Sequence, residues 1–161
     1  AFARDVAQGL ALLAAQLDGV PAGLARTDAQ GRLARAKEIA ATGRGVPVLR
    51  AARHTLLEGL AAAYDARSAS GLPVGAPPPP PNDAPVTAEP VDVVVDGRTY
   101  RALPAYRPGS VHHFAGGDLA GVSVPGGWYE TPFWEPLLVA DTEKAQLAGL
   151  DADTTVGSGQ P

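Results

Sequence analysis

Hydrophobic residues recur at helical spacing through the first seventy residues, and this pattern predicts three helices. In the first stretch, Phe2–Leu17, large apolar side chains return every three or four positions, and the charged and amide side chains lie on other faces. The second stretch, about Asp28–Thr42, follows Thr27-x-x-Gln30, which has the order of a capping box. The third, Pro47–Arg67, begins with a proline suited to a first helical turn. These stripes indicate a small bundle, or helices that need a partner to cover them.

A proline-rich tract at Gly71–Pro90 interrupts the helical pattern, and it includes the unbroken run Pro77–Pro81. Proline has a fixed φ and no backbone N–H, so the tract joins neither a helix nor a sheet ladder. We expect an extended polyproline strap whose consecutive prolines span roughly 15 Å. An ordinary tolerated linker is the alternative interpretation.

The clearest local signal is Val91–Leu103, where hydrophobic and polar residues alternate on both sides of Asp96–Gly97. Both residues of a type I′ turn need positive φ, and Asp-Gly is a preferred pair for it. A two-residue loop then sets the register, from Val95 opposite Arg98 to Val91 opposite Ala102. Period-two alternation places the following residues on one face: Val91, Val93, Val95, Tyr100 and Ala102.

The segment after this hairpin is rich in glycine, proline and aromatic residues, which favours further short strands. We expect them at Ser110–Phe114, Leu119–Val124 and Trp128–Glu130. Asp141 is positioned to cap a short helix at Thr142–Ala148. The last residues, Asp151–Pro161, have few apolar side chains and are expected to form an extended tail.

The predicted fold class is α+β, in four consecutive parts. They are a helical head at residues 1–70, a Pro-rich extended strap at 71–90, a small antiparallel β module with a short C-terminal helix at 91–150, and an extended tail at 151–161. A chain of 161 residues suits one ordinary domain or two very small ones. The strap favours two small bodies.

Composition and charge exclude several kinds of functional site. The chain has no cysteine, so disulfides, thiolate metal sites and cysteine nucleophiles are excluded. No apolar run approaches the ~18 residues needed to span a bilayer, and we expect a soluble protein. Residues 1–70 carry nine basic and six acidic side chains, and residues 71–161 carry four basic and eleven acidic. Such a weakly basic head predicts no direct nucleic-acid recognition. The opposite charges of the two halves are consistent with attraction within one chain or between copies, and equally with an ordinary solvated surface.

His112 and His113, with Asp118, come nearest to a reactive cluster. A metal ion needs several converging ligands, and a general base needs a positioned proton partner. Adjacent side chains on a strand point to opposite faces, so the two histidines do not easily share a metal. The remaining histidine, His54, belongs to the helical head. We therefore predict no catalytic, cofactor-binding or metal-binding residue.

Other motifs are incomplete. Ser123 stands in Gly-x-Ser-x-Pro, where a nucleophile elbow needs glycine at the last position. Gly43-Arg-Gly45 precedes a helix but lacks the lysine of a phosphate-binding loop. Glu130 and Glu135 have the residue type of a glycosidase pair, but two carboxylates at this spacing in a Pro-broken stretch are common by chance.

Aromatic residues concentrate in the β module, where seven of the chain's nine lie between Tyr100 and Trp134. A small core of large side chains accounts for such a cluster. The alternative is a contact surface for a protein or a sugar, because Trp and Tyr dominate such contacts. The candidate partner-binding residues are Tyr106, Trp128, Tyr129, Phe133 and Trp134.

The absence of a catalytic set, the strap and the uneven charge favour a non-enzymatic structural or accessory subunit of a large multi-subunit assembly, such as a phage-type virion. Its expected partners are proteins, either other subunits of the same particle or copies of itself. The expected docking elements are the strap, the tail and the aromatic β module. The second hypothesis is a small glycan- or peptide-binding module that uses the cluster Trp128–Trp134. The third is a small metal-dependent or hydrolytic enzyme that uses His112, His113 and Asp118.

Overall fold

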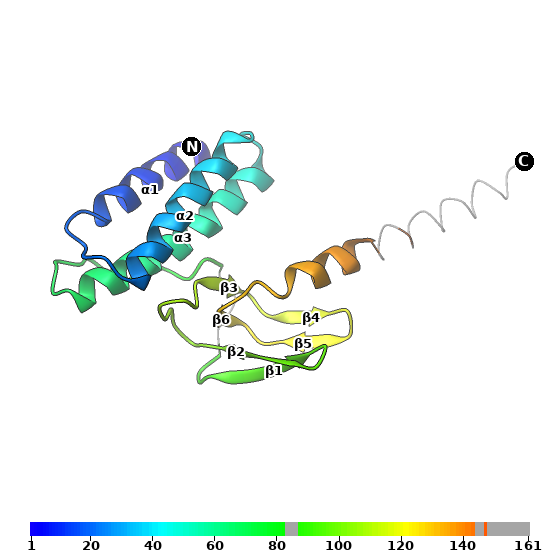
Figure 1. Cartoon of the computed structure of the whole chain (residues 1–161). Coiled ribbons are helices and arrows are strands. Elements are labelled where there is room, and N and C mark those ends of the chain that lie inside the picture. Colours follow the sequence, from blue (N-terminus) through cyan, green and yellow to red (C-terminus); the bar gives the residue numbers. More distant parts are fainter. Residues whose placement is uncertain (83–86, 144–146, 148–161) are drawn as a thin grey trace, which may run out of the picture.

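The structure, a computed structural model, describes residues 1–82, 87–143 and 147. Within these residues, three helices form one layer and short strands form a second layer beside it (Figure 1). The predicted α+β class is confirmed: helices come first, then small antiparallel sheets and a short C-terminal helix. None of the described helices is long and apolar enough to cross a membrane.

The helical periodicity is confirmed along the first seventy residues. The helices are α1 (Phe2–Gln16), α2 (Leu24–Ala41) and α3 (Val46–Ala69). α3 packs against both of the others and contains more buried residues than either. Gly59 permits the close approach, because a Cβ there would lie 2.7 Å from Leu13 Cδ2 and 2.9 Å from Arg32 Cβ.

The start of α2 differs from the predicted capping box. The helix begins at Leu24 with Gly23 at the N-cap position, so Thr27 lies inside the first turn. Its hydroxyl donates to Gly23 O at 3.0 Å and caps no backbone N–H. Thr side chains within a helix bond in this way to the carbonyl four residues earlier. The predicted capping box is therefore wrong.

The first hairpin, β1 (Val91–Val95) with β2 (Arg98–Ala102), is confirmed in register and in turn type. All five predicted cross-strand pairs are present. Asp96 and Gly97 have φ angles of 50° and 76°, as a type I′ turn requires. Three residues of the predicted inner face are buried: Val93, Val95 and Ala102.

Four short strands complete the β part. They are β3 (His112–Phe114), β4 (Gly117–Leu119), β5 (Val122–Val124) and β6 (Gly127–Tyr129). β3 pairs with β6, and β4 pairs with β5. Backbone bonds of 2.9 Å in both directions between Leu103 and Trp128 join the first hairpin to β6. The β part is thus three small ladders, of which β1–β2 and β3–β6 are linked edge to edge.

The predicted strand Leu119–Val124 is wrong in its middle. Ala120 and Gly121 have φ angles of 49° and 79°, so the chain turns there and folds back as the β4–β5 hairpin. A run of alternating apolar residues conceals this turn, because its only local sign is a single glycine at the second turn position. The strand predicted at Ser110–Phe114 begins later, at His112.

The C-terminal helix begins at residue 135 and is described to residue 143, well before the predicted start at Thr142. Asp141 therefore lies inside the helix and does not cap it. Its Oδ1 accepts the backbone N–H of Ala120 at 3.0 Å and ties the helix to the β4–β5 turn. The predicted end of this helix and the tail Asp151–Pro161 lie outside the described residues.

Helices and strands share one hydrophobic cluster. It contains Leu13, Leu56 and Ala62 from the helices, with Tyr106, Val111 and Trp128 from the β part. A second cluster lies within the β part and includes Tyr129 and Trp134. The shared cluster fixes how the two parts sit together, and their ability to fold separately stays a prediction.

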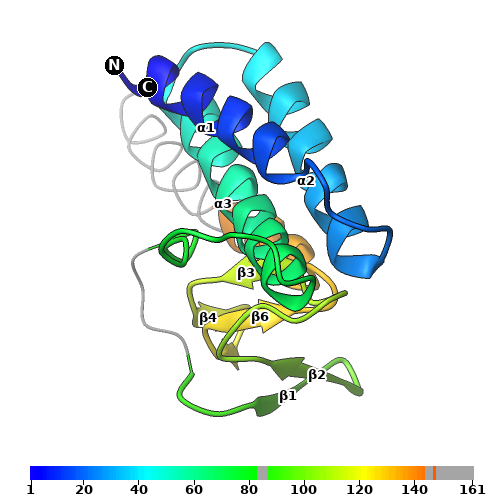
Figure 2. The ribbon, with the colours of Figure 1, turned by 90° about the vertical axis from the view of Figure 1, so that its left-hand side faces the viewer.

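The strap lies back along α3, as Figure 2 shows for residues 71–82. Pro77 and Pro78 line a cavity with Tyr64, and Pro81 lines another with His54. Tyr64 and His54 are ten positions apart on α3, about 15 Å at 1.5 Å per residue. Five extended prolines span the same length. The proline run therefore follows this stretch of α3.

Candidate functional site at the helix–strand junction

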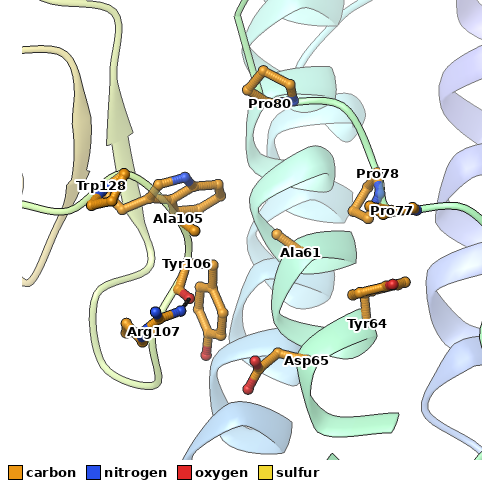
Figure 3. Close-up of a pocket in the computed structure, with 11 residues that line it drawn as sticks. Ala61, Tyr64, Asp65, Pro77, Pro78, Pro80, Ala105, Tyr106, Arg107 and Trp128 are labelled. Carbon is orange, nitrogen blue, oxygen red and sulfur yellow. Dashed lines mark hydrogen bonds between the residues drawn. The ribbon is translucent and has the colours of Figure 1, made fainter. Parts of the chain in front are cut away.

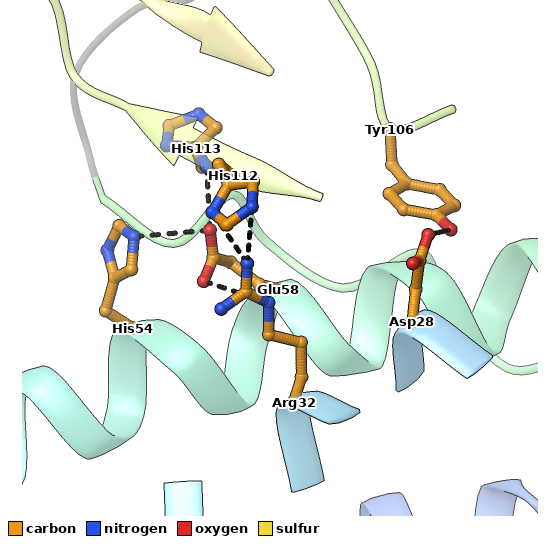
Figure 4. Close-up of polar contacts among 7 residues, drawn as sticks. All are labelled: Asp28, Arg32, His54, Glu58, Tyr106, His112 and His113. Atoms are coloured by element: carbon orange, nitrogen blue, oxygen red, sulfur yellow. Dashed lines mark hydrogen bonds and ion pairs between the residues drawn. The ribbon is translucent and has the colours of Figure 1, made fainter. Parts of the chain in front are cut away.

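Glu58 on α3 is the centre of a polar cluster between the helices and β3 (Figure 4). Its carboxylate accepts the backbone N–H of His113 at 2.7 Å. It also lies 3.6 Å from Arg32 Nε and 3.7 Å from His54 Nε2. Because Glu58 is only 4 % exposed, these contacts replace the water that its charge would otherwise need. We call Arg32, His54, Glu58, His112 and His113 the Glu58 cluster.

Helix geometry places the first three members. His54 and Glu58 are four positions apart on α3, so they lie on the same face. Arg32 reaches them from α2, which comes close because Gly59 has no side chain to hold it away. Because Gly59 lets α2 come close to α3, Arg32 reaches the buried carboxylate of Glu58 and serves as its cation partner.

The two adjacent histidines have different surroundings. Arg32 Nη2 donates to His112 Nδ1 at 2.8 Å, whereas the His113 ring lies edge-on to Trp128, with ring centroids 5.0 Å apart. Burial lowers the pKa of His112, and the neighbouring Arg32 lowers it further. Burial also lowers the pKa of His113 to about 4, with His54 adding to the effect. Both imidazoles are therefore neutral near pH 7.

Asp118 does not join the Glu58 cluster. It is exposed on β4, opposite Ser123 of β5. Across residues 1–82, 87–143 and 147, no three His, Asp or Glu side chains are placed to hold a metal ion. An enzyme acting through His112, His113 and Asp118 stays a prediction, and the structure places these residues in two different ladders.

A second carboxylate ties α2 to the β part (Figure 4). Asp28 Oδ2 accepts the hydroxyl of Tyr106 at 2.7 Å and the backbone N–H of Gly109 at 2.8 Å. Burial and the hydrogen bond to Asp28 raise the pKa of Tyr106. Asp28 and Glu58 thus each accept a backbone N–H from the β part. Such charge-assisted bonds hold the two layers together.

The predicted partner-binding aromatics lie mostly inside the protein. Those that are buried are Tyr106, Trp128, Tyr129 and Trp134. Phe133 is half-buried and stacks on Tyr100 with ring centroids 4.0 Å apart. Glycan binding requires an open aromatic face, which Phe133 comes closest to offering. Binding of a protein or sugar by this set stays a prediction.

A largely apolar cavity of 360 Å³ lies beneath the strap (Figure 3). The proline run and Tyr64 form one side, and Tyr106 and Trp128 form the facing side. Recognition domains bind Pro-rich segments in aromatic-lined grooves of this kind. Here the chain's own prolines form part of the lining.

The weaker motifs do not converge on a site. Ser123 is exposed on β5, and Gly45 is the N-cap of α3, within the turn between α2 and α3. Glu130 and Glu135 line different cavities. We therefore interpret these residues as structural or solvent-facing, as the sequence suggested.

Sequence reasoning missed Arg32, His54 and Glu58. These residues are separated from His113 by more than fifty positions, and no local pattern reports contacts across such a distance. One signal was present: Glu58 follows two leucines within a stretch of α3 that is otherwise apolar and buried. A charged residue at such a position needs a partner.

Comparisons with models of known protein families, with curated proteins and with solved structures gave no match. The function is therefore inferred from the geometry of this chain.

Proposed function

We propose that this chain is a non-enzymatic structural subunit of a large multi-subunit assembly, such as a phage-type virion, and that it docks on a neighbouring protein through its C-terminal helix. The carboxylates of Asp28 and Glu58 are engaged in holding the two layers together. That use of the polar groups supports a structural role for the junction.

The observation that carries the proposal is the exposed apolar side of the helix at residues 135–143. Leu137, Leu138 and Val139 are consecutive, and a helix turns about 100° per residue, so one face cannot bury all three. Leu137 packs against the β part, which leaves Leu138 42 % and Val139 56 % exposed. In Figure 1 this helix, in orange, lies beside the β4–β5 hairpin, to whose turn Asp141 is hydrogen-bonded. Neighbouring apolar side chains that stay exposed on a helix are typical of protein contact surfaces.

The test is Val139→Glu, which places a charge in the proposed contact without disturbing a buried residue. Wild-type and variant chains are tagged and purified from the producing cells, and the chains that travel with them are compared. Light scattering gives the size of each complex. We expect wild type to bring down defined partner chains and Val139→Glu to lose them by about tenfold or more.

Val94→Glu is the matched control, since it makes the same substitution at a valine that is 63 % exposed on β1. It should leave association unchanged, and circular dichroism should show both variants folded. A wild-type chain that purifies alone as a monomer contradicts the proposal. So does equal association of the wild type and Val139→Glu.

A further inference from the structure

A cavity of 460 Å³ opens beside the Glu58 cluster, between α2, α3, β3 and the C-terminal helix. Its size falls within the range of small-molecule sites in proteins. One part of its lining is polar and contains the whole Glu58 cluster. The apolar part of the lining includes Ile39, Phe114, Trp134 and Leu138. The lining thus combines polar groups with aromatic rings.

Two residues of this lining carry buried polar atoms that have no hydrogen-bond partner. They are His113, through both Nδ1 and Nε2, and Asn82, through Oδ1. His113 is 2 % exposed, and its nearest aromatic neighbours, Trp128 and His54, form no hydrogen bond with it. Buried polar atoms are almost always satisfied in native proteins. Both side chains rotate about two torsions, so either can turn its polar atoms toward an occupant of the cavity.

Charge in the lining is balanced. Arg32 and Arg35 are offset by Glu58 and Glu135, and Arg32 is already engaged with Glu58 and His112. A neutral imidazole at His113 has one nitrogen that donates and one that accepts. A charged ligand therefore gains little binding energy from this lining. A neutral group with both a donor and an acceptor can form hydrogen bonds with both nitrogens of His113.

The aromatic residues of the lining favour a ligand with a flat shape. Phe114 and Trp134 lie with ring centroids 5.0 Å apart and a tilt of 30°, so they form an aromatic surface beside the polar one. We propose that the cavity binds a small neutral ligand: a flat ring with an amide or equivalent donor–acceptor edge, which hydrogen-bonds His113 and Asn82 while the ring lies against Phe114 and Trp134. The cavity shares Leu138 with the docking helix, but its test measures the binding of a small molecule and not association with a protein.

Three probes of similar size test the proposal on the full chain: benzamide, which is neutral, benzoate, which only accepts, and benzylamine, which is a cation. Each is titrated at pH 7.5 and followed by NMR of the Trp134 indole and the His113 ring. Benzamide should bind with an affinity typical of a small fragment and about tenfold more tightly than either charged probe, a ratio that corresponds to 1.4 kcal/mol. Failure of all three probes to bind overturns the proposal, because bound water would then be enough to satisfy the polar atoms of His113 and Asn82.

Variants locate the binding. His113→Phe keeps an aromatic ring but removes both nitrogens, so benzamide binding should weaken by about tenfold. Asn82→Ala should weaken it several-fold, and it carries the test if His113→Phe does not fold. Ser123→Ala, on the exposed side of β5, is the control and should bind like wild type. Equal binding of benzamide by wild type and both cavity variants, or equal binding of all three probes, overturns the proposal.

Discussion

Replacing Glu58 by alanine should strongly destabilise the protein, because its carboxylate sits at the contact between helices and strands. The substitution leaves two groups without their partner. The backbone N–H of His113 loses its 2.7 Å acceptor, and Arg32 loses the carboxylate 3.6 Å from its Nε. The side chain of Arg32 is only 15 % exposed, so water replaces the carboxylate poorly.

The magnitude follows from these two losses. A buried donor left unsatisfied costs about 1–3 kcal/mol, and breaking a buried ion pair costs about 3–5 kcal/mol. Arg32 keeps its hydrogen bond to His112 and some exposure, so the lower ends apply. We expect Glu58→Ala to lower the free energy of unfolding by about 3–4 kcal/mol. Glu58→Gln retains an acceptor for the His113 N–H and should cost about half as much.

Urea unfolding measured with two probes provides the assay. Far-UV circular dichroism reports mainly the helices, and tryptophan fluorescence reports the β part, which contains both tryptophans, Trp128 and Trp134. Both transitions should move together in Glu58→Ala, since the residue joins the two layers. The control is Glu38→Ala, which removes an exposed ion pair with Arg35 that is shorter, at 3.1 Å; it should change stability by less than about 0.5 kcal/mol.

A loss below about 1 kcal/mol for Glu58→Ala would refute this reasoning, because it would mean that water reaches the site. A shift confined to one probe would show that head and β module unfold as separate bodies. In that case the sequence-based division into two small domains would hold, despite their shared hydrophobic cluster.

Tyr106→Phe removes a hydroxyl that donates to Asp28 at 2.7 Å and should cost about 1.5–3 kcal/mol, as bonds to charged groups do; a smaller shift in the urea midpoint would place water at this carboxylate. Gly97→Val forces a branched residue to a φ of 76° and should cost about 1–3 kcal/mol, while Gly75→Val, which has no positive φ and open space around it, should be neutral. Burial lowers the pKa of His113 from 6.5 to about 4, so between these values the unfolded chain binds a proton that the folded chain does not. Stability should therefore fall by up to about 3 kcal/mol as the pH drops through this window, and His113→Phe should flatten that slope.

Elements governed by neighbouring residues were predictable from the sequence. The β1–β2 hairpin is correct in all five pairs, because a two-residue turn allows one register and Asp96–Gly97 tolerates positive φ. The helices are correct to within a few residues, because apolar periodicity shows which face is buried.

Elements governed by distant packing were not predictable. The turn at Ala120–Gly121 has no strong local mark, and the helix from residue 135 starts before the capping residue that the sequence suggests. The aromatic residues are buried partly by the helical layer and partly by one another. The composition of the β module does not distinguish such a buried cluster from an open binding surface.

Thus the sequence by itself determined the α+β order of elements and the first hairpin, because each depends on torsions or periodicity within a few residues. Only the tertiary structure decided that the strap turns back on α3. It also decided that Glu58 meets His113 across fifty-five positions. Those contacts depend on which apolar faces pack together and on which buried charge finds a partner, and both are properties of the whole folded chain.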